Sequence, residues 1–152
     1  MESFTNDKNS LIGKAGQHLV CCDLLLRGYN AFIADEGLSY DLLLDLNSAI
    51  KKIQVKTTQS VISTKKQKNI YRFFVRMGKK TKQKYKKEDF DILALVFLDI
   101  NKIAYINVNN ITSTDKKHVK TTIEFRDKEK YPSKTQKTKY VQDFTFDKAI
   151  GL

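Results

Sequence analysis

Residues 38–57, LSYDLLLDLNSAIKKIQVKT, are predicted to form a β-hairpin around which the rest of the chain folds. Leu, Ile and Val predominate over 39–46 and 49–57, which indicates two strands, and Asn47-Ser48 between them suits a tight turn. A two-residue loop fixes the register of the strands, pairing Leu46 with Ala49, Leu44 with Lys51, and Asp41 with Gln54.

Three polar side chains of this hairpin are expected to meet. Opposed side chains lie roughly 5 Å apart at Cβ, so Asp41 and Gln54 offer two oxygens to one small ion. Lys56 lies on the same face as Gln54 because strand side chains alternate, although a one-residue slip would separate them. Such a group suits Mg²⁺-assisted cleavage of a phosphodiester. The alternative is an amphipathic hairpin with Asp41 capping its start and Lys56 in solvent.

Composition points to a single domain, residues 1–152, with a polyanionic partner. The formal net charge is +11, with 28 Lys and Arg against 17 Asp and Glu, which favours nucleic acid first and a membrane surface second. No apolar run approaches the ~20 residues that span a bilayer, and MESFTNDKNS does not resemble a secretory signal, so we expect a cytoplasmic protein. The adjacent Cys21 and Cys22 and two histidines do not suggest a zinc site.

Positive charge is concentrated between Leu46 and Lys87, where the sequence contains no Asp or Glu. A DNA backbone is expected to lie along this tract; a merely solvated cationic surface is the alternative. A strand over 70–77 would place Arg72, Phe74 and Arg76 on one face. The candidate DNA-binding residues are Lys51, Lys65, Lys66, Arg72, Arg76, Lys79, Lys80, Lys82 and Gln83.

The remaining elements follow from periodicity and turn signals. A helix is predicted over 11–27, capped by Ser10 and ended by Gly28, and its Gly13 and Gly16 permit close approach of another backbone or a ligand. The other predictions are strands at 29–34, 90–98, 102–108 and 118–125, a loop or short helix at 78–87, and a helix at 144–150. The core is placed at about 11–108, and 109–152 is interpreted as a DNA-contact or oligomerisation region.

The order of helix, strand with Asp41, and strand with Gln54-Val55-Lys56 resembles the PD-(D/E)XK nuclease superfamily, most closely its small intron-encoded homing endonucleases. Tyr40 stands in place of the proline. The resemblance implies an α/β, restriction-endonuclease-like core with a central mixed sheet flanked by helices. It also implies cleavage of double-stranded DNA with Mg²⁺, or with Mn²⁺ or Ca²⁺ in its place, by a homo-oligomer, a tetramer being favoured over a dimer.

The resemblance also assigns roles within the site. Gln17, Asp41, Gln54 and Lys56 would be catalytic, and Asp41, Gln54 and the Val55 carbonyl would hold the metal. Gln17 stands where the first helix often supplies Glu, so Asp41 is the single carboxylate among these ligands unless Asp35 or Glu36 contributes. We therefore hypothesise a weak or inactive nuclease, with Gln17 either natural or a substitution that traps uncut DNA.

Two other functions remain open. A structure-selective nuclease, such as a Holliday-junction enzyme, would read DNA shape in the same fold. A basic nucleic-acid-binding module would perform no chemistry, and its binding would be salt-sensitive and indifferent to divalent ions.

Overall fold

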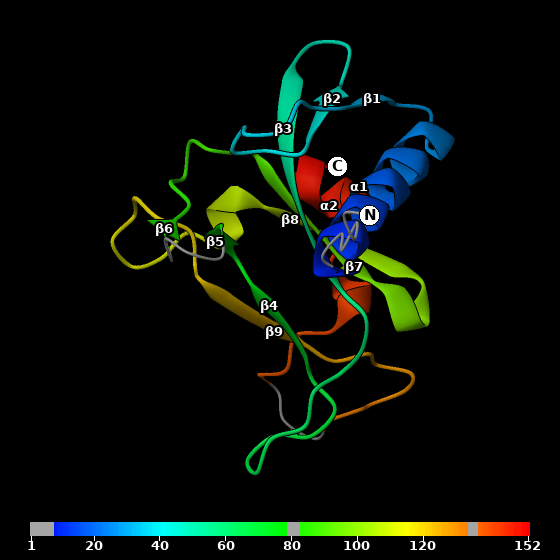
Figure 1. Cartoon of the computed structure of the whole chain (residues 1–152), viewed down its shortest axis with the longest axis vertical. Coiled ribbons are helices and arrows are strands. Elements are labelled where there is room, and N and C mark those ends of the chain that lie inside the picture. Colours follow the sequence, from blue (N-terminus) through cyan, green and yellow to red (C-terminus); the bar gives the residue numbers. More distant parts are fainter. Residues whose placement is uncertain (1–7, 79–82, 134–136) are drawn as a thin grey trace, which may run out of the picture.

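A five-stranded sheet forms the centre of the computed structural model, which describes residues 8–78, 83–133 and 137–152 (Figure 1). The strands, in spatial order, are β1 (Asn30–Ile33), β2 (Leu42–Asp45), β3 (Ile50–Thr58), β7 (Ile92–Phe97) and β8 (Lys102–Asn107). β3 and β7 run parallel, whereas the other neighbours are antiparallel, so the sheet is mixed as predicted.

The predicted hairpin register is confirmed. Leu44 lies opposite Lys51, and the Leu46 amide donates to the Ala49 carbonyl at 3.0 Å. Asn47 takes a positive φ of 66°, which a tight hairpin turn requires and asparagine tolerates. β2 is shorter than predicted: its pairing with β3 ends at Leu42 opposite Ile53, so Asp41 and Gln54 are not a strand pair, although the Asp41 amide still donates to the Ile53 carbonyl.

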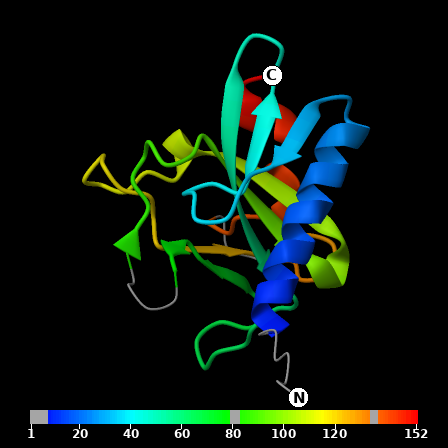
Figure 2. The ribbon, with the colours of Figure 1, turned by 45° about the horizontal axis from the view of Figure 1, so that its top comes forward.

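The two helices cover one face of the sheet. α1 (Lys8–Leu26) and α2 (Phe146–Ile150) bury that face's apolar side chains, including Val20, Leu24 and Phe146. α1 begins before the predicted cap and ends ahead of Gly28, whose φ of 89° favours glycine. Figure 2 shows α1 lying along the side of the sheet formed by β1, β2 and β3.

A small antiparallel sheet, rather than a helix, covers the other face. β4 (Tyr71–Phe74) pairs with β9 (Thr122–Phe125), and we call this pair the β4–β9 ribbon. The rings of Phe73 and Phe125 pack edge-on around Phe97 of the central sheet. β7 is thereby buried throughout, as its apolar sequence predicts. The expected mixed sheet is confirmed, with its helices restricted to one face.

The single strand predicted over 70–77 was wrong. The chain changes partners near Val75, whose amide donates to Thr121, and continues as β5 (Arg76–Met77), which pairs with β6 (Gln83–Lys84). The predicted 118–125 strand is restricted to β9, and the predicted loop or helix at 78–87 contains β6. Short 3₁₀ turns complete the fold at Leu98–Ile100, Val108–Asn110 and Val141–Asp143.

Candidate active site

The carboxylate of Asp41 lies at the free edge of β3, just beyond the end of β2. The Asp41 amide donates to the Ile53 carbonyl at 2.8 Å, and the Val55 amide donates to Asp41 Oδ2 at 2.8 Å. The side chain thus satisfies a strand amide that a longer β2 would have paired. This contact fixes the carboxylate in position, since a backbone donor on a strand cannot swing away.

Both glutamines identified from the sequence contact this carboxylate. Gln54 Nε2 donates to Asp41 Oδ2 at 2.7 Å, and Gln17 Nε2 on α1 donates to Oδ1 at 3.1 Å. Gln54 is 5 % exposed, so its amide is held within the site. The structure therefore brings together side chains from α1, the start of the hairpin and β3.

Lys56 completes the group. Its Nζ donates to the Arg76 carbonyl at 3.1 Å and lies 5.4 Å from the centre of the Tyr85 ring. Lys56 is therefore anchored inside the protein, and the alternative with this lysine in solvent was wrong. No sequence pattern predicts the contributions of the Arg76 backbone or Tyr85, because both come from the irregular region around β5 and β6.

Burial shifts the ionisation of both charged groups in opposite directions. Burial raises the pKa of the Asp41 carboxyl, while the Val55 hydrogen bond and the positive charge of Lys56 lower it. Burial likewise lowers the pKa of Lys56, and the negative charge of Asp41 raises it. Each group thus favours the charged form of the other, which indicates an electrostatically coupled pair.

Close packing of α1 on β3 places Gln17. A Cβ added to Gly16 would lie 1.8 Å from Thr57 Oγ1, so only glycine fits without displacement. Thr57 Oγ1 is itself buried, with no hydrogen-bond partner among the described residues. The predicted close approach is confirmed at Gly16, whereas a Cβ at Gly13 would meet nothing within 4 Å.

These residues face an open cleft of about 680 Å³. The cleft is bounded by the N-terminal half of α1, the free edge of β3 with residues 59–62, and β4. Asp41, Gln54, Lys56 and Gln17 line it, as do Arg72 and Phe74, whose side chain is 64 % exposed. A phosphodiester entering this cleft would meet Lys56 beside Asp41.

The donor atoms fit a hard divalent cation. Asp41, the amide oxygens of Gln17 and Gln54, and the Val55 carbonyl form an all-oxygen set of the kind that Mg²⁺ prefers. Both glutamine amides now present their NH₂ groups to Asp41, so each would turn over to present oxygen. Throughout residues 8–78, 83–133 and 137–152, no three His, Cys, Asp or Glu side chains form a metal-binding cluster.

Among the described candidate DNA-binding residues, three are exposed and three are half-buried, and Arg72 is held in an ion pair. Arg72 pairs with Glu124, its Nη2 lying 2.7 Å from Oε1, so the acid-free tract is partly balanced by a distant glutamate. Arg76 is half-buried, and its Nε has no hydrogen-bond partner within the described part of the chain. Lys65, Lys66 and Gln83 are exposed and Lys51 is half-buried, while Lys79, Lys80 and Lys82 lie outside the described residues.

Glu36, considered from the sequence as a second carboxylate, is paired elsewhere. It lies 3.1 Å from Lys14, so it does not supply a carboxylate to the site.

Comparison with known proteins agrees with this geometry. The model of the PD-(D/E)XK endonuclease family matches residues 7–147. The structure resembles that of a bacterial homing endonuclease, I-Ssp6803I, with a TM-score of 0.70 and 20% sequence identity, covering 90% of this chain and 88% of that chain. At this identity the likeness is one of fold. Comparison with curated proteins found no match.

Proposed function

The chain belongs to the PD-(D/E)XK endonuclease family, and we propose that it is a divalent-metal-dependent endonuclease that cleaves double-stranded DNA at a specific site. The observation that carries this proposal is the convergence of Asp41, Gln54 and Lys56 on one cleft. We further propose a homing type of recognition, following the fold's likeness to a homing endonuclease.

The residues divide the work of hydrolysis between them. Asp41, Gln54 and the Val55 carbonyl would hold a Mg²⁺ ion, with Gln17 as a weaker fourth ligand. A bound divalent ion acidifies water and offsets charge on the phosphate. Lys56 orients the attacking water through its N–H donors and contributes positive charge beside the reacting phosphorus. Its anchoring by Arg76 keeps the ammonium at the cleft wall.

Gln17 lowers the affinity for the cation in this proposal. A neutral amide at this position leaves one formal negative charge among the ligands, whereas glutamate would add a second. The Gln17 side chain donates a hydrogen bond to Asp41 Oδ1 at 3.1 Å. We therefore propose slow cleavage by the chain as it stands, and faster cleavage by Gln17→Glu.

Cleavage of a randomised duplex pool tests the proposal. The chain and its Gln17→Glu variant would be incubated with the pool and Mg²⁺, and the cut molecules sequenced, with Lys56→Ala as the inactive control. We expect a long, pseudo-palindromic consensus, because a symmetric oligomer reads a symmetric site. If neither the parent chain nor Gln17→Glu yields cleavage products, the nuclease proposal is contradicted. Preferential cleavage of a four-way junction over linear duplex would indicate that the enzyme recognises DNA shape and not a specific sequence.

We also propose that the enzyme assembles as a homo-oligomer, with a tetramer favoured over a dimer. Apolar side chains support a subunit contact around β1 and the hairpin, where Phe32, Ile33 and Ile50 are 57 %, 41 % and 58 % exposed. Light scattering of the purified chain would give the mass of the assembly. Within the described part of the chain, neither helix combines the length and apolar character needed to cross a membrane.

A further inference from the structure

A second hollow lies along β9, whereas the cleft around Asp41 is bordered by β4, and we call this second hollow the outer groove. Its volume is about 520 Å³. Three stretches form its walls: Gln67 and Ile70 before β4, residues 122–126 along β9, and residues 137–139. None of the catalytic residues lines it, so the outer groove is separate from the cleft.

Three cationic side chains and one carboxylate, Glu124, line the outer groove among the described residues. Arg126, Lys137 and Lys139 line it. Burial and, after it, the nearby positive charge of Lys120 lower the pKa of Lys139. The adjacent carboxylates already have cationic partners, Glu124 with Arg72 and Asp127 with Lys102. A polyanion in the groove would relieve this like-charge repulsion.

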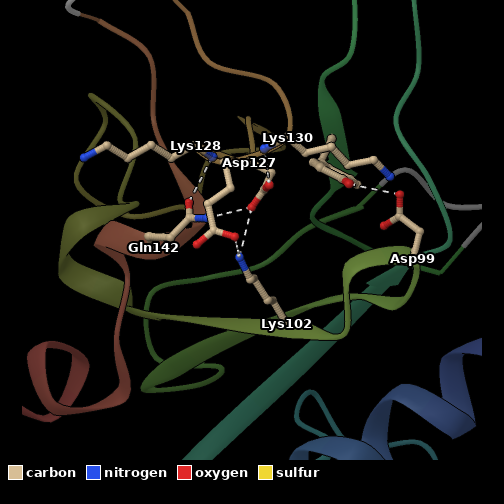
Figure 3. A network of polar contacts seen from close by, with 8 residues as sticks. Asp99, Lys102, Asp127, Lys128, Lys130 and Gln142 are labelled. Carbon is tan, nitrogen blue, oxygen red and sulfur yellow. Dashed lines mark hydrogen bonds and ion pairs between the residues drawn. The ribbon is translucent and has the colours of Figure 1, made fainter.

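The wall that carries Lys137 and Lys139 is fixed to the core. The Arg126 amide donates to the Lys139 carbonyl at 2.9 Å, and the Val141 amide donates to the Arg126 carbonyl at 3.1 Å. Asp127, next in the chain, is 2 % exposed and accepts hydrogen bonds from Lys102 and Gln142 (Figure 3). These hydrogen bonds hold the backbone at Lys139 beside Arg126, and the network around Asp127 connects this part of the chain to Lys102 of β8.

The outer groove and the catalytic cleft share the β4–β9 ribbon. Arg72 and Phe74 of β4 line the cleft, and their β9 partners Glu124 and Thr122 line the groove. The loop of residues 59–70 also borders both, with its first residues at the cleft and Gln67 and Ile70 at the groove. One duplex lying across the ribbon would therefore meet both hollows.

We propose that the outer groove binds the sugar–phosphate backbone of the duplex that is cut in the cleft, on the flank of the cleavage site. This inference rests on the proposed function. Its contacts are to phosphate, so they add affinity and register without reading bases. The ion pair between Arg72 and Glu124 separates the two binding surfaces and keeps the ribbon itself nearly neutral.

Salt-dependent binding tests the inference independently of cleavage. Fluorescence anisotropy with a duplex of about 40 base pairs in EDTA would compare the chain with Lys137→Gln/Lys139→Gln. We expect the slope of log K against log salt to become shallower by about 1.8, since each phosphate contact contributes about 0.9. Lys148→Gln is the matched control, because this exposed lysine lies on α2 across the sheet, and its slope should fall by less than about 0.3.

The outcomes separate this inference from the proposed function. A shallower slope for the double variant supports the outer groove whether or not Mg²⁺ produces cleavage. An unchanged slope, or an equal change in Lys148→Gln, overturns it even if the chain proves to be a nuclease.

Discussion

The catalytic cleft and the outer groove show two ways in which one chain builds a polar surface. In the cleft, Asp41 and Gln54 are positioned by the register of one hairpin and by backbone hydrogen bonds. In the outer groove, Arg126, Lys137 and Lys139 come from two nearby segments, and no side chain among the described residues pairs with them. The first arrangement depends on every contact being kept, whereas the second tolerates the loss of single charges. Mutations should therefore have large, specific effects in the cleft and small, roughly additive effects in the groove.

Lys56→Ala is expected to have the largest effect. Removing a positioned charge from the reacting phosphate should lower the single-turnover rate of cleavage by at least about a hundredfold. Lys52→Ala, on the same strand but with its Nζ at the Glu88 carbonyl, is the control and should stay within about threefold of the parent chain. Comparable losses in the two variants would show that general charge, and not the position of Lys56, matters.

Gln17→Glu should make the stability of the cleft depend on metal. The substitution replaces a hydrogen-bond donor by a carboxylate about 3 Å from Asp41, and such pairs repel strongly when both are ionised. In EDTA we expect a loss of about 1–3 kcal/mol in the free energy of unfolding, with recovery in saturating Mg²⁺. Thermal melts with and without Mg²⁺ measure this, and equal stability in EDTA would contradict the contact.

Gly16→Ala tests how α1 is seated on β3. The new Cβ would meet Thr57 Oγ1, and overpacking of this kind costs about 1–3 kcal/mol. Thr57→Ala in the same chain should restore most of the lost stability, because it removes the atom in conflict. Gly13→Ala is the matched control, since its Cβ meets nothing, and it should stabilise the helix by up to about 1 kcal/mol. Urea unfolding of the four proteins would distinguish these effects, and an undiminished loss in the double variant would refute the steric account.

The smallest expected effect concerns pH. Because burial raises the pKa of Asp41, the folded chain retains this proton at pH values where the unfolded chain has released it. The contribution of Asp41 to stability should therefore fall as the pH rises from the ordinary pKa of aspartic acid through the raised one. Urea unfolding across this range should give a shallower decline in Asp41→Asn than in the parent chain. A parallel decline in both would assign the effect to other groups.

The parts of the fold that could be predicted are those set by short-range patterns. The two-residue turn at Asn47-Ser48 fixes the register of β2 and β3, and this register places Asp41 close enough for the Gln54 side chain to contact it. The pairing of Arg72 with Glu124 brings together residues far apart in sequence, and nothing local marks them as partners. For the same reason the β4–β9 ribbon was missed, and a tract without acids in sequence proved partly neutralised in space.

In the site, too, the features that depend on contacts between distant parts of the chain could not be predicted from local patterns. Gln17 came from a resemblance, and its contact with Asp41 depends on a glycine packed against a threonine of another element. The outer groove depends on residues 137–139, whose position is set by hydrogen bonds to Arg126 and by the burial of Asp127. Neither the contact of Gln17 with Asp41 nor the position of residues 137–139 follows from a periodic pattern or a residue spacing in the sequence.

Paramagnetic broadening by Mn²⁺ tests the central claim most directly, because it locates a divalent cation without requiring cleavage. Backbone amide signals of the ¹⁵N-labelled chain would be followed during titration with substoichiometric Mn²⁺, with Asp41→Asn as the control. We predict that the signals of Asp41, Gln54 and Val55 broaden first, and that the substitution abolishes this selectivity. Early broadening elsewhere, or unchanged broadening in Asp41→Asn, would contradict a metal site at the free edge of β3.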